Sequence, residues 1–194
     1  MKGNDKRDKL IQTGKQIIVQ SGFNAASLNE ILNAADVPKG SFYYYFSSKE
    51  DFGLAIIDSF AAKYHQKLQE ILQDKNSPYL KRLRNYFESG IANMKASKCN
   101  DGCLMGNLAQ ELSAQNESFR ERLSQIFLDW ENAFATCLRF AYEAGELSQD
   151  QDVLSLAQFI LAGWQGATLQ AKVSKSVIPM ETFISILFDR ILIN

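Results

Sequence analysis

Two short helices around a tight turn are encoded between Ser27 and Glu50, and this stretch constrains the fold more than any other part of the chain. Ser27 precedes Glu30 by three residues, the spacing of a capping box, in which a hydroxyl and a carboxylate satisfy free N–H groups at a helix start. Pro38 suits the first turn of a second helix, because its missing N–H has no partner there. The break falls between Ala35 and Pro38, which predicts a helix-turn-helix.

The second of these helices has two unlike faces. Phe42, Tyr45 and Phe46 recur at helical spacing on the side expected to pack in the core. The opposite side carries small, hydroxylic and aromatic residues, which suit contact with a nucleic acid. Ser47 and Glu50 repeat the capping spacing and predict a third helix, whose first N–H groups could hold a backbone phosphate.

These patterns together predict one nucleic-acid-binding face. Its positions are helix starts, the outer face of the second helix and a lysine beside the third helix. The candidate DNA-binding residues are Ser27, Pro38, Lys39, Gly40, Ser41, Tyr43, Tyr44 and Lys49. An ordinary helix pair in a structural α protein is the alternative interpretation.

The run from Val37 to Phe46 (VPKGSFYYYF), followed by Ser48-Lys49-Glu50, closely resembles the DNA-binding domain of the TetR family of transcriptional regulators. The resemblance implies an all-α fold with a three-helix helix-turn-helix domain, residues 1–47, and a C-terminal helical ligand-binding and dimerisation domain, residues 48–194. It also implies a homodimeric repressor that binds a palindromic operator in double-stranded DNA and is released by an inducer.

The charge pattern limits how such a chain binds DNA. The formal net charge is −1 over 194 residues. Residues 1–50 contain seven Lys or Arg and five Asp or Glu, a net charge of +2, and the remainder carries −3. Because phosphate contacts need local positive charge, we expect a few placed contacts in a dimer rather than a broad basic surface.

Helical periodicity runs through almost the whole chain, which has three prolines. A first helix is predicted to end near Gly22, and the third to extend from Ser47 to about residue 74. A further helix is predicted at about 78–97. A turn at 100–102 follows, and after it a shorter helix that ends at about 114. A long helix is then predicted from 117 to Gly145. Ser77 and Ser148 are the predicted caps of two of the later helices, the second of them with Gln151, and Pro179 begins the last helix.

The last two helices are predicted to form a dimer surface. The run 153–171 is uncharged but contains five Ser, Thr or Gln residues, so a buried or interface helix is favoured over a membrane span. The final helix is apolar on more than one side and needs two partners. Both partners can be intramolecular, whereas the resemblance favours a two-fold four-helix interface. Residues 1–9 are polar and charged, unlike a secretory signal, so a cytoplasmic location is expected.

Aromatic and sulfur-containing side chains in the middle of the chain form a candidate apolar ligand pocket, although such residues are more often simply core. The candidate pocket residues are Tyr64, Tyr86, Met94, Met105, Trp130, Phe134 and Trp164.

In a chain expected in the cytoplasm, three cysteines do not make a disulfide framework. The single histidine, His65, argues against an ordinary zinc site. Cys103 follows a predicted turn at a helix start, where the helix dipole favours a thiolate, whereas Asp101 opposes it. The segments Gly102–Leu104, Leu169–Ser174 and Pro38–Tyr43 resemble the NemR-like branch of the family. That resemblance implies release when a cysteine reacts with electrophiles or oxidants.

By this resemblance Cys103 is the candidate thiol sensor and Lys172 a candidate basic neighbour. A buried, inert cysteine is the alternative. Reversible binding of a small apolar or aromatic inducer remains the other mechanism of release.

An enzyme is not expected, because the sequence lacks a phosphate-binding glycine signature, a metal-ligand cluster and a nucleophile–base set. No metal or cofactor is therefore predicted. A purely structural helical adaptor is the remaining functional class.

Overall fold

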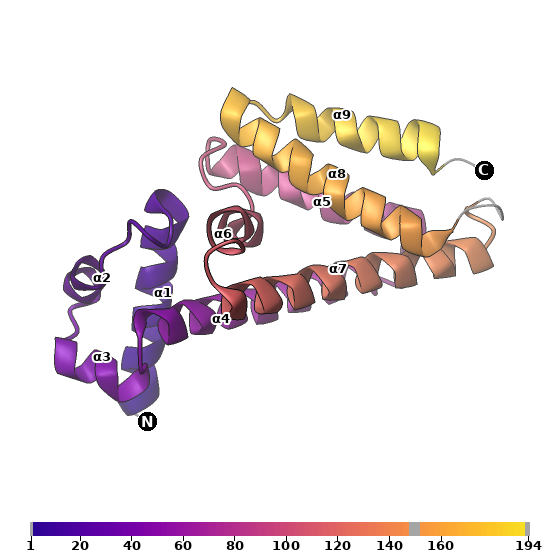
Figure 1. Ribbon diagram of the computed structural model, residues 1–194. Helices are drawn as coiled ribbons and strands as arrows, with labels where there is room; N and C mark the ends of the chain where they lie inside the picture. Colours follow the sequence, from indigo (N-terminus) through magenta and orange to yellow (C-terminus); the bar gives the residue numbers. More distant parts are fainter. Residues whose placement is uncertain (1, 148–151, 193–194) are drawn as a thin grey trace. The chain divides into compact units, whose positions relative to one another are not determined.

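The structure is a computed structural model that describes residues 2–147 and 152–192, with side chains from residue 5. Helices make up all the regular secondary structure within these ranges (Figure 1). They are α1 (Lys2–Ser21), α2 (Leu28–Ala35), α3 (Lys39–Tyr45), α4 (Lys49–Leu72), α5 (Tyr79–Ala96), α6 (Leu104–Leu112), α7 (Glu117–Glu143), α8 (Val153–Ser174) and α9 (Ile178–Ile186). The predicted all-α, helix-turn-helix architecture is confirmed.

The chain divides into two compact units. The first comprises Met1–Lys63 with Leu104–Leu123, and the second Tyr64–Cys103 with Ser124–Asn194. Both α4 and α7 contribute residues to each unit. The division after residue 47 drawn from the sequence stays a prediction about domain organisation.

Local signals determine the boundaries of the first three helices. Gly22 has a φ of +86°, in the left-handed region, and ends α1. Ser27 Oγ accepts the N–H of Glu30 at 3.1 Å, so the predicted cap of α2 is confirmed. Asp36, with φ 52°, ends α2. Pro38 lies at the N-cap of α3, one position before the helical turn predicted for it.

The start of α4 differs from the prediction by one residue. Ser48, not Ser47, caps the helix: its Oγ accepts the N–H of Asp51 at 3.0 Å. The Asp51 carboxylate in turn accepts the N–H of Ser47 at 2.8 Å and its hydroxyl at 3.1 Å. Glu50, predicted to complete the cap, instead accepts a hydrogen bond from Asn116 Nδ2 at 2.9 Å. Both serines lie three residues before an acid, so spacing alone does not separate them.

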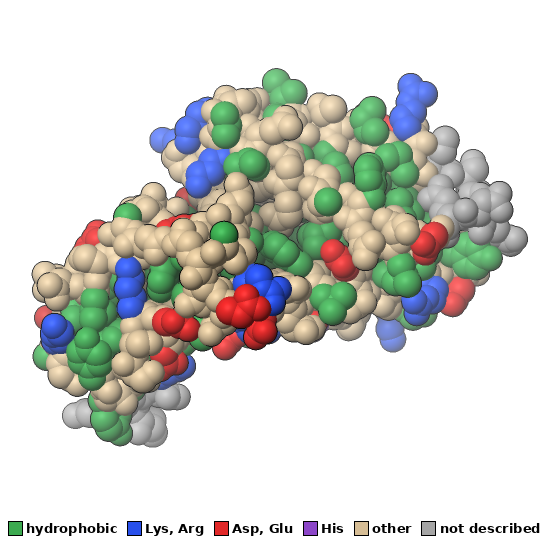
Figure 2. Space-filling view, viewed as in Figure 1, with side chains coloured by type: hydrophobic (Ala, Val, Ile, Leu, Met, Phe, Trp, Pro, Cys, Tyr) green, Lys and Arg blue, Asp and Glu red, His purple; other side chains and the backbone are tan. Residues whose placement is uncertain are grey.

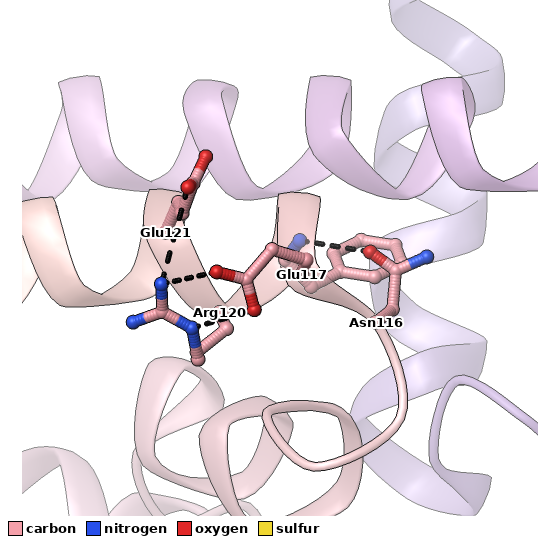
Figure 3. Close-up of polar contacts among 5 residues, drawn as sticks. Asn116, Glu117, Arg120 and Glu121 are labelled. Atoms are coloured by element: carbon pink, nitrogen blue, oxygen red, sulfur yellow. Dashed lines mark hydrogen bonds and ion pairs between the residues drawn. The ribbon is translucent and has the colours of Figure 1, made fainter.

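Asn116 also begins α7. Its Oδ1 accepts the N–H of Phe119 at 3.0 Å, and Arg120 pairs with Glu117 and, at 3.9 Å, with Glu121 (Figure 3). These surface ion pairs contribute little to stability. Nearby, the Phe119 ring meets Phe23 edge-on with centroids 5.0 Å apart.

In the second unit, the start of α5 is capped by Glu146, which lies far along the chain. Its two carboxylate oxygens accept the N–H groups of Tyr79 and Leu80 at 3.0 and 2.9 Å. The predicted cap, Ser77, is wrong: its hydroxyl donates to Asp74 at 2.7 Å. A remote carboxylate thus replaces the local hydroxyl, because it satisfies two free N–H groups at once.

Small residues bring α5, α8 and α9 close together in the second unit. A Cβ at Gly90 would lie 2.6 Å from Trp164, and one at Gly163 would lie 2.6 Å from Phe183. The Phe87 ring sits among them, with centroids 4.8 Å from Trp164 and 5.6 Å from Phe183.

Several predicted boundaries of the C-terminal helices can be compared with the structure. Pro179 lies in the first turn of α9, as predicted, and Leu187–Ile191 extends that helix with π-type hydrogen bonding. Asp152 caps α8, its carboxylate accepting the N–H of Leu154 at 3.1 Å. The predicted cap formed by Ser148 and Gln151 lies outside the described residues. Among the described helices, none is long and apolar enough to cross a membrane.

Candidate nucleic-acid interface and sensor site

The two faces of α3 are as different in the structure as in the sequence. Phe42 and Phe46 are buried and pack on Phe52 of α4, with ring centroids 5.4 and 4.9 Å away. On the other side Tyr44 is 81% exposed and Tyr43 is 53% exposed. Buried aromatics anchor the helix, so the two tyrosines project from a fixed support.

The other candidates on and beside α3 are also accessible. Lys39, Gly40 and Pro38 are exposed, and Ser41 is half-buried. A Cβ at Gly40 would meet nothing within 4 Å, which leaves room for a close approach by another molecule. Ser27 is exposed, and while its oxygen caps α2 its hydroxyl proton can still donate. Their contacts with DNA stay predictions.

The Lys49 side chain contacts two residues of the α1–α2 turn. Its Nζ donates to the carbonyl of Asn24 at 3.3 Å and lies 4.8 Å from the centre of the Phe23 ring. Burial lowers the pKa of Lys49, and the negative charge of Glu111 partly opposes that shift. An ammonium group has three donors, so the bond to Asn24 is compatible with a phosphate contact.

Cys103 immediately precedes α6, as predicted, and is half-buried. Gln165 Nε2 on α8 donates to its Sγ at 3.5 Å. The charge of Cys103 also acts on two tyrosines, Tyr64 and Tyr86, whose hydroxyls share a hydrogen bond. Burial raises the pKa of both tyrosines, and the nearby Cys103 adds to the rise. Cys103 therefore belongs to a polar cluster inside the second unit.

Lys175, at the C-cap of α8, contacts the loop that leads to Cys103. Its Nζ donates to the carbonyl of Cys99 at 3.3 Å and to Asn100 Oδ1 at 2.6 Å. Lys172, the predicted neighbour, lies half-buried in the last turn of α8, two turns after Gln165. Its role stays a prediction.

Most candidate pocket residues pack against one another. The Tyr64 ring lies 4.5 Å from Trp130, and Tyr86 lies 5.3 Å from Phe134, measured between centroids. Tyr64, Tyr86 and Trp164 line a cavity of about 40 Å³. Met94 is buried on α5, and Met105 is buried in α6 of the first unit. A volume this small suits a water molecule rather than a drug-sized ligand.

Within the part of the chain that the structure describes, no three His, Cys, Asp or Glu side chains are grouped as metal ligands.

The N-terminal and C-terminal parts of the chain match the two domains of one protein family. Residues 10–56 match the bacterial regulatory proteins of the tetR family, and residues 80–187 match the tetracyclin repressor-like C-terminal domain. The chain belongs to the TetR family of transcriptional regulators. TetR regulators bind DNA operators and small-molecule inducers and are not enzymes, so the chain is a DNA-binding transcriptional repressor of this family.

Several relatives match almost the full length of this TetR regulator. The HTH-type transcriptional repressor DhaR of Mycobacterium sp. (strain GP1) is 34% identical, over 96% of this chain and 92% of DhaR. The HTH-type transcriptional repressor NemR of Escherichia coli (strain K12) is 37% identical, over 92% of this chain and 89% of NemR. The crystal structure of reduced E. coli NemR superposes with a TM-score of 0.90 at 35% identity, covering 95% of this chain and 96% of that one.

Sequence reasoning about this TetR regulator missed three residues near the candidate sites: Gln165, Lys175 and Glu111. Gln165 contacts Cys103 from α8, and Lys175 contacts the preceding loop from the C-cap of α8. Glu111 contacts the turn between α1 and α2 from α6, at 2.7 Å. No local pattern marks them, because each acts on residues more than sixty positions away.

Proposed function

We propose that this protein is a homodimeric repressor that binds a palindromic operator through α3 and releases it when Cys103 reacts with an electrophile or oxidant. The DNA-binding part rests on the exposed face of α3, where Tyr43, Tyr44 and Lys39 project opposite buried phenylalanines. The modest positive charge of the N-terminal region means that one copy supplies few phosphate contacts, so two copies on two half-sites are needed.

Apolar exposure on α8 and α9 supports a dimer interface there. Figure 2 shows apolar side chains at the surface over these helices, and Phe159, Ile178 and Ile186 are 53%, 65% and 49% exposed. These three residues line a groove of about 640 Å³ between α8 and α9. A contiguous apolar groove of this kind supports an interaction site on this face. A second copy of the same two helices would cover it as a four-helix contact.

The observation that carries the sensing proposal is the position of Cys103. It is partly accessible, it precedes a helix start, and Gln165 donates to its sulfur. The other cysteines differ: Cys99 is 5% exposed and Cys137 is 4% exposed, and burial raises the pKa of Cys137 to about 12. Of the three thiols, Cys103 is the one in a setting that favours reaction.

Reversible binding of an apolar ligand among the aromatic residues is the alternative. It is less well supported, because the cavity between Tyr64, Tyr86 and Trp164 holds about 40 Å³, below the roughly 300 Å³ of small ligand pockets.

Operator release by a thiol reagent tests the proposal. Purified protein is bound to its operator, treated with N-ethylmaleimide, and followed by fluorescence anisotropy. We expect release from the wild type and retention by Cys103→Ser, with Cys137→Ser as the matched control that releases like the wild type. Equal release from Cys103→Ser would exclude sensing through this thiol, and an aromatic compound that releases both proteins reversibly would favour the alternative.

A further inference from the structure

The turn between α1 and α2 has the backbone geometry of an anion site. Gly22 is in the left-handed region, and the next two N–H groups, of Phe23 and Asn24, point to the same place. Successive N–H groups in such a turn form a concave site for a negative charge. The site is occupied by a side chain of the protein itself, the carboxylate of Glu111.

Glu111 binds this turn with both oxygens. Oε2 accepts the N–H of Phe23 at 2.9 Å, and Oε1 accepts the N–H of Asn24 at 2.7 Å. Hydrogen bonds to a charged acceptor are stronger than neutral ones. A Cβ at Gly22 would lie 3.0 Å from Oε2, so glycine is needed here both for its backbone angle and for the approach of the carboxylate.

A second contact ties the same turn to the end of α6. Asn24 Nδ2 donates to Gln115 Oε1 at 3.1 Å, while Gln115 Nε2 donates to the carbonyl of Glu111 at 2.7 Å. The backbone and the side chain of Asn24 are therefore both held by residues at or just beyond the C-terminal end of α6. All of these residues belong to the first unit.

The contacts continue from the turn to the first turn of α4. The carbonyl of Asn24 accepts a hydrogen bond from Lys49, which also lies over the ring of Phe23. Lys49 feels the charge of Glu111 and is a candidate phosphate contact. Glu111 and Asn24 thus connect α6 to Lys49, the first residue of α4.

The opposite end of α6 begins at Leu104, directly after Cys103. A nine-residue helix spans about 13 Å. Its last turn carries Glu111.

We propose that Glu111 is a positioning residue, which fixes the α1–α2 turn and Lys49 in the arrangement that binds the operator, and through which α6 passes a change at Cys103 to the DNA-binding helices. The second half of this inference rests on the proposed thiol-sensing function. The first half does not, because it concerns the untreated protein alone.

Glu111→Gln tests both halves. Glutamine keeps the size of the side chain, but it removes the charge and turns one acceptor into an NH₂ group that faces a backbone N–H. Operator affinity is measured for untreated and N-ethylmaleimide-treated protein, and the ratio of the two dissociation constants gives the coupling. Glu117→Gln is the matched control, a surface glutamate of the same unit that pairs with Arg120 (Figure 3).

We expect untreated Glu111→Gln to bind the operator about tenfold more weakly than wild type, and its coupling ratio to fall at least about fivefold. The alkylation rate of Cys103 should be unchanged. A residue with a merely structural role would lower the melting temperature and leave the coupling ratio at its wild-type value, which would overturn the coupling. Wild-type affinity of the untreated variant would overturn the positioning role.

Two further outcomes are separable. If alkylation leaves the operator affinity of the wild type unchanged, the sensing function fails, while the untreated affinity of Glu111→Gln still decides the positioning role. If circular dichroism shows that Glu111→Gln does not fold, Glu111→Asp takes its place under the same criteria, since it keeps the charge but is too short to reach both N–H groups.

Discussion

Phe42 and Tyr44 are two residues apart on α3, yet Phe42 is fully buried and Tyr44 is 81% exposed. The buried ring attaches α3 to α4, and the exposed ring is available to a partner. We expect Tyr44→Ala to weaken operator binding about 5- to 50-fold while leaving the melting temperature unchanged, because surface substitutions rarely alter stability. Fluorescence anisotropy and thermal melting measure the two quantities. Tyr142→Ala, an exposed tyrosine on α7, is the control, and equal effects of the two substitutions would contradict the assignment of this face.

Lys49 is predicted to contact a backbone phosphate. In a dimer, Lys49→Ala removes two such contacts, so the slope of log affinity against log salt concentration should become shallower by about 2. Titrations at a series of salt concentrations give this slope. Lys63→Ala removes an exposed lysine farther along α4 and should leave it unchanged. An unaltered slope in Lys49→Ala would mean that Lys49 serves only its bond to Asn24.

The three thiols should react with iodoacetamide at different rates. Because the pKa of Cys137 is raised to about 12, only about 1 in 10⁴ of these thiols is ionised at pH 8. Cys103 should therefore be labelled first, before the buried Cys99 and Cys137. Peptide mapping by mass spectrometry over time measures the order. Labelling of Cys137 as fast as Cys103 would show that burial does not control reactivity here.

Stability should fall in alkaline solution. Burial raises the folded-state pKa of Tyr64, Tyr86 and Cys137 above the usual values of 10.0 for tyrosine and 9.0 for cysteine. Above about pH 9 the unfolded chain loses protons that the folded chain keeps, so the free energy of unfolding decreases as pH rises.

A variant with both Tyr64→Phe and Tyr86→Phe isolates this effect. It removes the two hydroxyls together, so neither loses its partner and stability at pH 8 changes little. Urea unfolding at pH 8 and pH 10.5 should show a smaller loss for the double variant than for wild type. The same loss in both proteins would exclude the tyrosine pair as a cause.

Ile186→Asp should prevent dimerisation. The substitution places a charge in the apolar groove between α8 and α9, and burying an unpaired charge is costly. We expect a monomer in sedimentation experiments and at least about 100-fold weaker operator binding, because the two half-sites are no longer bound together. Leu128→Asp changes an equally exposed leucine on α7 and should remain dimeric. A dimeric Ile186→Asp protein would place the interface elsewhere.

Sequence reasoning succeeded where the determining contacts are local. The cap of α2 by Ser27 and the two faces of α3 depend on residues within one or two helical turns, and both are present in the structure. It failed at the starts of α4 and α5. Ser47 and Ser48 match the same spacing, and the α5 start depends on Glu146, far along the chain.

The candidate sites show the same division. An aromatic residue at a core position has the same helical spacing whether it lines a pocket or fills it, so the close packing of Tyr64 and Trp130 was not predictable. Lys172 and Lys175 are likewise three residues apart. Lys175, at the C-cap of α8 with a φ of 53°, contacts the Cys103 loop, and no sequence pattern specifies that angle.

Glu146 has a consequence for the order in which the chain folds. It completes the start of α5 from 67 residues downstream of Tyr79, and Glu111 completes the α1–α2 turn from 88 residues downstream of Phe23. On a ribosome, both N-terminal partners emerge well before their carboxylates are synthesised. The start of α5 and the α1–α2 turn therefore lack these hydrogen bonds early in translation. They gain them only after α6 and the segment after α7 have been synthesised.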